Sequence, residues 1–183
     1  GRKMVSFDSR WKSPQLLAMA AMLVALVSIT IVMLPSDNNS SSALVAQEGF
    51  SEFRAEMVNI IQSGFELDVR SGNTEELDMW FMQHSSPLID SEAAQGLAQH
   101  AMGCKTLQWD GKPVSLMCYR LGEGKVVHLF VMDLENEAIG GLPLEETKLL
   151  AQVNALNTAS WQEEGKAYLL VAHNPGTKVT PYL

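Results

Sequence analysis

The fold is decided by KTLQWDGKPVSLMCYRLGEGKVVHLFVMD, residues 105–133. Short turns separate three runs in it that are rich in β-branched, aromatic and other apolar residues: 105–109, 113–121 and 125–133. The first turn is Asp110-Gly111, a pair that is typical of tight β-hairpins because their central residues need positive φ. The last run is almost continuously apolar, as expected of a central strand. We predict consecutive antiparallel strands, with 125–133 at the centre of their sheet.

Two further strands are predicted downstream, at Thr158–Gln162 and Lys166–Ala172, with a glycine turn between them. Between these strands and the first three, residues 144–156 have the spacing of a short helix. The tail from Asn174 to Leu183 contains two prolines and a glycine. We expect that tail to be loose.

Helical patterns precede the strands. One apolar stripe recurs at helical spacing and ends at Ser63-Gly64, with glycine in the usual C-terminal position: Phe50, Phe53, Met57, Ile60, Ile61. Alternation over residues 65–70 predicts a half-buried strand. Asn73 is predicted to cap a second helix with Glu76 as its capping-box partner, and Ser91–Ala101 is predicted to be a short helix.

Helices followed by a run of antiparallel strands predict an α+β domain over residues 47–183, with the helices packed on one face of the sheet. The domain is preceded by QLLAMAAMLVALVSITIVML, residues 15–34, which contains no charged residue. About twenty apolar residues are what a helix needs to cross a bilayer. A cleaved signal peptide has a shorter apolar region, and Leu44-Val45-Ala46 fits a cleavage site poorly. We predict that 15–34 is an uncleaved transmembrane helix.

Charge predicts the orientation of this helix. Residues 1–14 carry four basic residues and one acidic residue, whereas residues 35–183 carry nine basic and twenty acidic residues. Basic residues beside the first span stay in the cytoplasm, so 1–14 is predicted to be a cytoplasmic segment of a bacterial inner-membrane protein, with the C-terminal domain in the periplasm. Residues 35–46 are rich in serine and asparagine and are predicted to be a flexible linker.

The acidity of the domain also bears on its partners. Nucleic acid should be repelled by a domain of this charge, which argues against a nucleic-acid partner. We expect other membrane or periplasmic proteins as partners, and contact with the lipid bilayer through residues 15–34.

Cys104 and Cys118 are the only cysteines, and they flank the predicted hairpin. If Trp109 pairs with Lys112 across a two-residue turn, the two cysteines face opposite sides of the sheet. If the loop holds three residues, Cys104 opposes Cys118 directly, at a separation close to that of a disulfide. Because an oxidising compartment favours the bond, this pair is the candidate disulfide, with two buried free thiols or a redox-sensing pair as alternatives.

No motif indicates catalysis, a metal site or a cofactor. The sequence contains no Gly-x-Ser-x-Gly elbow, His-Glu-x-x-His pair, calcium loop or glycine-rich phosphate loop. His128 lies in the most apolar strand, so we interpret it as a hydrogen-bonded core histidine; a pairing with Cys118 across adjacent strands is a weaker alternative. We therefore expect neither catalytic, cofactor-binding nor metal-ligating residues, and no enzymatic activity.

Residues 53–183 resemble the extracytoplasmic part of bacterial anti-sigma-factor-like single-pass membrane proteins. The marks of the resemblance are Gly103-Cys104, WDGKPVS at 109–115, Cys118 and TASW at 158–161. Such proteins generally carry a small cytoplasmic domain, often with a zinc-binding His-x3-Cys-x2-Cys motif, that holds the sigma factor. Residues 1–14 do not contain that domain.

Two functions fit these observations. The first is a membrane-anchored periplasmic binding or interaction module, non-enzymatic, of the kind the resemblance implies. The second is an accessory structural subunit of a larger inner-membrane protein complex, whose helix packs against other membrane spans. A cytoplasmic sigma-binding domain upstream of Gly1 would favour the first function, whereas an initiator methionine just before Gly1 would favour the second.

Overall fold

The computed structural model describes residues 38–134, 140–142 and 147–183, with side chains from residue 49 onward. The predicted cytoplasmic segment 1–14 and membrane span 15–34 lie outside the described residues. Among the helices that are described, none is both long enough and apolar enough to cross a bilayer. One compact unit covers residues 40–183.

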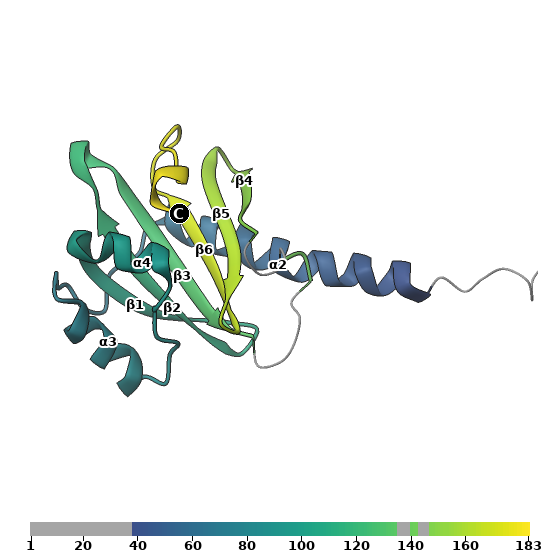
Figure 1. Cartoon of the computed structure of the whole chain (residues 1–183), viewed down its shortest axis with the longest axis horizontal. Helices are drawn as coiled ribbons and strands as arrows, with labels where there is room; N and C mark the ends of the chain where they lie inside the picture. Colours follow the sequence, from purple (N-terminus) through teal and green to yellow (C-terminus); the bar gives the residue numbers. More distant parts are fainter. Residues whose placement is uncertain (1–37, 135–139, 143–146) are drawn as a thin grey trace, which may run out of the picture. The chain divides into compact units, whose positions relative to one another are not determined.

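This unit is a small α+β domain, which confirms the predicted class (Figure 1). Its helices are α2 (Asn38–Ser63), α3 (Thr74–Gln83) and α4 (Glu92–Leu97). Its strands are β1 (Ala101–Trp109), β2 (Lys112–Arg120), β3 (Val126–Asp133), β4 (Leu149–Val153), β5 (Leu156–Glu163) and β6 (Lys166–Ala172). Short 3₁₀ turns occupy Ala98–His100, Gly122–Gly124 and Thr180–Tyr182.

The six strands form one antiparallel sheet in the order β1-β2-β3-β6-β5-β4. Strand β3 is therefore central, as its apolar sequence predicts, and its residues from Val127 to Met132 are buried. The predicted hairpin is formed with a two-residue turn: Trp109 pairs with Lys112, and Asp110 and Gly111 have φ of 48° and 75°. Both central residues thus have the positive φ of a type I′ turn.

Helices cover both faces of the sheet, which corrects the prediction that they pack on one face (Figure 1). Helix α2 packs on one face through Phe50, Phe53, Met57, Val58 and Ile61. Helices α3 and α4 pack on the other face through Leu77, Phe81, Ala93, Ala94 and Leu97. The reason is that β2, β3 and β6 are apolar at consecutive positions, so both faces of the sheet have apolar surface to bury.

Helix α2 differs from the prediction at its beginning. It starts at Asn38, so residues 38–46 are helical although they belong to the expected flexible linker 35–46. The apolar stripe that begins at Phe50 holds the C-terminal half on the sheet, and extending an existing helix costs little compared with starting one. The helix ends at Ser63, and Gly64 follows with φ of 77°, as predicted.

The region after α2 also departs from the prediction. Residues 65–70 alternate between half-buried and exposed side chains as expected, but only Val69 forms a bridge, to Cys104. Asn73 caps α3 by accepting from the Glu75 N–H at 2.9 Å. Its own N–H donates to Ser71 Oγ, which in turn donates to Glu76, so Ser71 stands between the two predicted capping-box partners.

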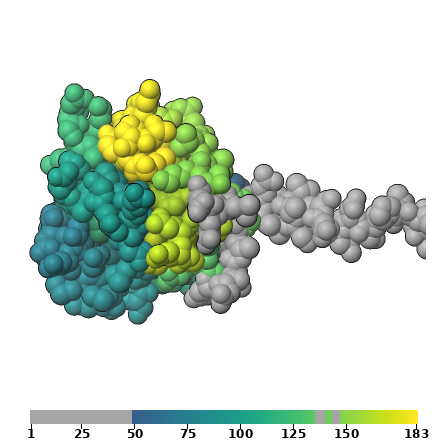
Figure 2. Space-filling model, viewed as in Figure 1, coloured from purple at the N-terminus to yellow at the C-terminus, as the bar shows by residue number. Residues whose placement is uncertain are grey.

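The predicted helix 144–156 is wrong where the structure describes it. Residues 149–153 form β4, and Asn154 and Ala155 make a two-residue turn into β5. The predicted loose tail is also wrong, because Val179 is buried against the sheet and Tyr182 and Leu183 pack on the same cluster. Figure 2 shows this C-terminal segment seated beside α4 and the last strands.

Candidate functional site

The two cysteines lie on opposite faces of the sheet. Cys104 pairs with Met117, and Cys118 pairs with Gly103, because the hairpin turn holds two residues. Cys104 is buried under α3 and α4, whereas Cys118 is buried under α2. Both are free thiols, so the predicted disulfide between them is not formed. The hairpin has the two-residue turn, which is the alternative that places the two thiols on opposite faces.

Cys118 begins a line of three hydrogen-bonding side chains. Its Sγ lies 3.0 Å from His128 Nδ1, and His128 Nε2 lies 3.0 Å from His173 Nδ1. His128 is directly opposite Cys118 in the β2–β3 register, and the Phe65 ring stands edge-on to it at 5.6 Å. The pairing that the sequence treated as the weaker alternative is formed. His173, just after β6, completes it and was not singled out by any motif.

Burial keeps Cys118 and His128 uncharged. It raises the pKa of the Cys118 thiol to about 12, with a smaller contribution from Cys104. It lowers the pKa of His128 to about 3, with His173 adding to the effect. A reactive cysteine needs a lowered pKa, which a charged imidazole beside the thiol can provide. Cys118 and His128 therefore lie as close together as a nucleophile and its base. Both are uncharged, however, as in a buried structural hydrogen bond.

The β1 edge of the sheet is closed by residues 65–70. The Cys104 N–H donates to the Val69 carbonyl at 2.9 Å, and the Asp68 N–H donates to the Cys104 carbonyl at 2.9 Å. The Asp68 carboxylate accepts from the Thr106 N–H and from Lys105, both at 2.9 Å. Backbone groups of Cys104 and Thr106 that could attract another strand are thus already occupied.

Gly103 allows this closure. Its φ is 151°, and a β-carbon there would overlap the Val69 carbonyl oxygen and lie 2.7 Å from Leu67 Cδ1. The pairing register also shifts between Ala101 and Gly103, which marks a β-bulge. A glycine at a bulge is the usual solution where two backbones approach closely.

The β4 edge is open among the described residues. Strand β4 ends the strand order, and no described segment other than β5 pairs with it. Its sequence, LLAQV, contains no charge or proline, the devices that commonly protect an edge strand. Leu149 and Leu150 are 39 % and 52 % exposed.

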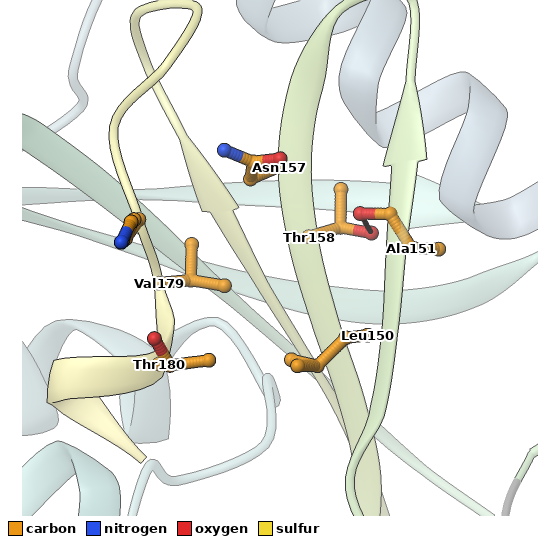
Figure 3. Close-up of a pocket in the computed structure, with 7 residues that line it drawn as sticks. Leu150, Ala151, Asn157, Thr158, Val179 and Thr180 are labelled. Atoms are coloured by element: carbon orange, nitrogen blue, oxygen red, sulfur yellow. Dashed lines mark hydrogen bonds between the residues drawn. The ribbon is translucent and has the colours of Figure 1, made fainter.

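A hollow of about 380 Å³ adjoins this edge (Figure 3). Its lining comes from β4, β5 and the C-terminal segment: Leu150, Ala151, Asn157, Thr158, Lys178, Val179 and Thr180. Asn157 fixes the segment by donating to the Thr177 carbonyl at 2.9 Å, and Thr158 donates to the Ala151 carbonyl at 3.2 Å. These bonds hold the C-terminal segment to β5 and β5 to β4 around the hollow.

Sequence reasoning missed this site because it assigned residues 144–156 to a helix. The Asn154-Ala155 turn has no glycine, although both residues have positive φ. The available signal was the asparagine, which tolerates that conformation, between two runs with β-compatible residues. Among residues 38–134, 140–142 and 147–183, no group of three or more potential ligands is placed to hold a metal ion.

Comparisons of the chain with protein-family models, with curated proteins and with solved structures found no match. The site is therefore interpreted from its own geometry and chemistry.

Proposed function

We propose that this chain is a membrane-anchored, non-enzymatic binding module that holds a protein partner at the β4 edge of its outer domain. The partner contributes an extended segment that pairs with β4 and places an apolar side chain in the adjoining hollow. This is strand addition, in which backbone hydrogen bonds supply affinity and side-chain pockets supply specificity. The anchor is the uncharged segment 15–34, and the outer location follows from the basic residues ahead of it.

The observation that supports the proposal is the asymmetry of the two sheet edges. In strand β1, backbone groups of Cys104 and Thr106 are engaged by Asp68 and Val69, whereas β4 has exposed leucines and no gatekeeper charge. An exposed edge strand without such protection promotes aggregation unless another strand pairs with it. Lys178, which lines the hollow, favours a partner segment with an acidic residue beside its apolar one.

The absence of enzymatic activity in this proposal is supported by the charge states at the Cys118–His128 pair. A neutral thiol and a neutral imidazole lack the ion pair that activates cysteine nucleophiles. The resemblance of residues 53–183 to the outer domains of anti-sigma-type regulators suggests a regulatory role for the bound partner. An accessory subunit would use the same edge for permanent assembly.

The test is co-purification in mild detergent of the wild-type chain, Leu150→Gln and a matched control, Met82→Gln. Met82 is 58 % exposed on α3, away from β4. We expect the wild type and Met82→Gln to retain the same partner, and Leu150→Gln to lose it. Retention by Leu150→Gln, or recovery of the wild type as a clean monomer, would contradict the proposal.

A further inference from the structure

Arg70 and Arg120 lack acidic partners among the residues that the structure describes. Lys105, Lys125 and Lys166 form ion pairs with Asp68, Glu123 and Asp90. Arg70 and Arg120 are exposed and make neither an ion pair nor a hydrogen bond with any residue that the structure describes. In a chain with a net charge of −8, two unpaired guanidinium groups are a local excess of positive charge.

The fold brings both arginines to one hollow of about 400 Å³. Ala101 pairs with Tyr119, so His100 and Arg120 lie at the same end of the β1–β2 hairpin, and residues 65–70 bring Arg70 to that end. The lining contains no carboxylate: Arg70, Gln99, His100, Ala101, Met102 and Arg120. Guanidinium groups converging without a counter-charge are suited to a carboxylate or phosphate.

An apolar pocket adjoins this hollow and shares two of its lining residues, Arg70 and Met102. The pocket holds about 280 Å³ and is lined largely by apolar side chains of α2, residues 65–70 and β3: Ile61, Phe65, Leu67 and Val126. Its polar end is the Cys118–His128–His173 line. An apolar cavity with a few convergent polar groups is the usual form of a small-molecule site.

The hydrogen-bond line can supply this pocket with a donor. In one of the two tautomer arrangements that the distances allow, the Cys118 thiol donates to His128 Nδ1 at 3.0 Å, and His128 Nε2–H donates to His173 Nδ1. His173 then carries a proton on Nε2, where it is available to a ligand.

We propose that the two cavities form one binding site for a small amphiphilic organic anion. The anionic head, a carboxylate or a phosphate ester, lies between Arg70, Arg120 and His100, and a short apolar tail occupies the pocket beside Phe65 and Leu67. The pocket has the volume of about nine water molecules, which suits a single short chain rather than a two-chain lipid.

This site is independent of the proposed protein-binding edge. The strand order places β1 and β4 at opposite edges of the sheet. Substitution of Leu150 should therefore leave the binding of the anion unchanged, and substitution of the arginines should leave the protein partner bound.

The test is equilibrium dialysis of labelled octanoate and octyl phosphate against the full chain in nanodiscs of zwitterionic lipid, with empty nanodiscs subtracted. The variants are Arg70→Gln/Arg120→Gln and, as matched control, Lys148→Gln, an exposed cation that lines neither of the two cavities. We expect at least one of the two anions to bind the wild type and Lys148→Gln alike. The double arginine variant should bind it about tenfold more weakly or worse.

Two further probes separate the contributions of head and tail. Octan-1-ol retains the tail without the charge, and inorganic phosphate retains a charged head without the tail. Both should bind at least about tenfold more weakly than the better octyl anion. The proposal is overturned if neither anion binds the wild type, if the double arginine variant binds as the wild type does, or if either probe matches the octyl anion.

Discussion

At the scale of single residues, the fold depends on positions where the surroundings limit which side chain is tolerated. Gly103 is the clearest: its φ of 151° and the proximity of Leu67 leave no room for a β-carbon. His128 is the second, because burial at 4 % exposure lowers its pKa and keeps its imidazole neutral. Each position leads to a measurable effect on stability.

Replacing Gly103 with alanine should lower the free energy of unfolding by about 3 kcal/mol, because the methyl group must push residues 65–70 away from β1. The measurement is urea denaturation of the full chain in detergent, with unfolding monitored by tryptophan fluorescence. Gly96→Ala in α4 is the matched control, because a β-carbon there meets nothing within 4 Å. That change should be neutral or stabilise by up to about 1 kcal/mol. Equal effects of the two substitutions would contradict the close approach at Gly103.

His128 should make the domain less stable as the pH falls from about 6.5 toward 3. Its pKa is near 3 in the folded protein and 6.5 ordinarily, so between these values only the unfolded chain binds the proton. The stabilisation is complete above pH 6.5 and is lost on acidification, with a slope of up to about 1.4 kcal/mol per pH unit. Urea midpoints at pH 4.5–6.5 should show a weaker pH dependence for His128→Gln than for the wild type. Identical slopes would show that His128 is protonated while the domain is folded.

At the scale of elements, the sequence predicts those parts whose signals are local and strong. Asp110-Gly111 identified the hairpin, the apolar run 125–133 identified the central strand, and Ser63-Gly64 identified the end of α2. The sequence left open whether Cys104 and Cys118 face each other, because hairpin loops of two and three residues both suit residues 109–113. Only the observed Trp109–Lys112 pairing places the thiols on opposite faces.

The elements that sequence reasoning missed have weak or misleading signals. Strand β4 is five residues long and precedes a turn without glycine, so its composition resembles that of a short helix. Helices on both faces were not predicted, because sequence order does not say on which face of a sheet a helix packs. His173 joined the candidate site only through tertiary structure, 45 residues after His128.

The β4–β5 turn gives a prediction at this scale. Ala155 has φ of 68°, which costs an alanine about 1 kcal/mol relative to glycine. Ala155→Gly should therefore raise the free energy of unfolding by about 1 kcal/mol, measured by urea denaturation. Ala151→Gly, in the strand itself, should instead lower it by about 0.5–1 kcal/mol. A destabilising Ala155→Gly would contradict the turn and with it the assignment of β4.

At the scale of the whole molecule, an uncharged segment, residues 15–34, precedes an acidic α+β domain whose β4 edge is open among the residues that the structure describes. A partner that is confined to the same membrane needs little intrinsic affinity for β4, because tethering raises its effective concentration. The anion site near β1 would then allow a second, chemical input to the same domain. The proposed function requires that the domain be held outside the cytoplasm.

Protease treatment of intact spheroplasts, followed by detection of both ends of the chain, tests this location most directly. We expect the protease to digest the domain without lysis, and to leave a membrane-associated fragment that contains residues 1–34. A domain that resists digestion until the spheroplasts are lysed would contradict the orientation. Recovery of the intact chain in the soluble fraction would contradict the anchor.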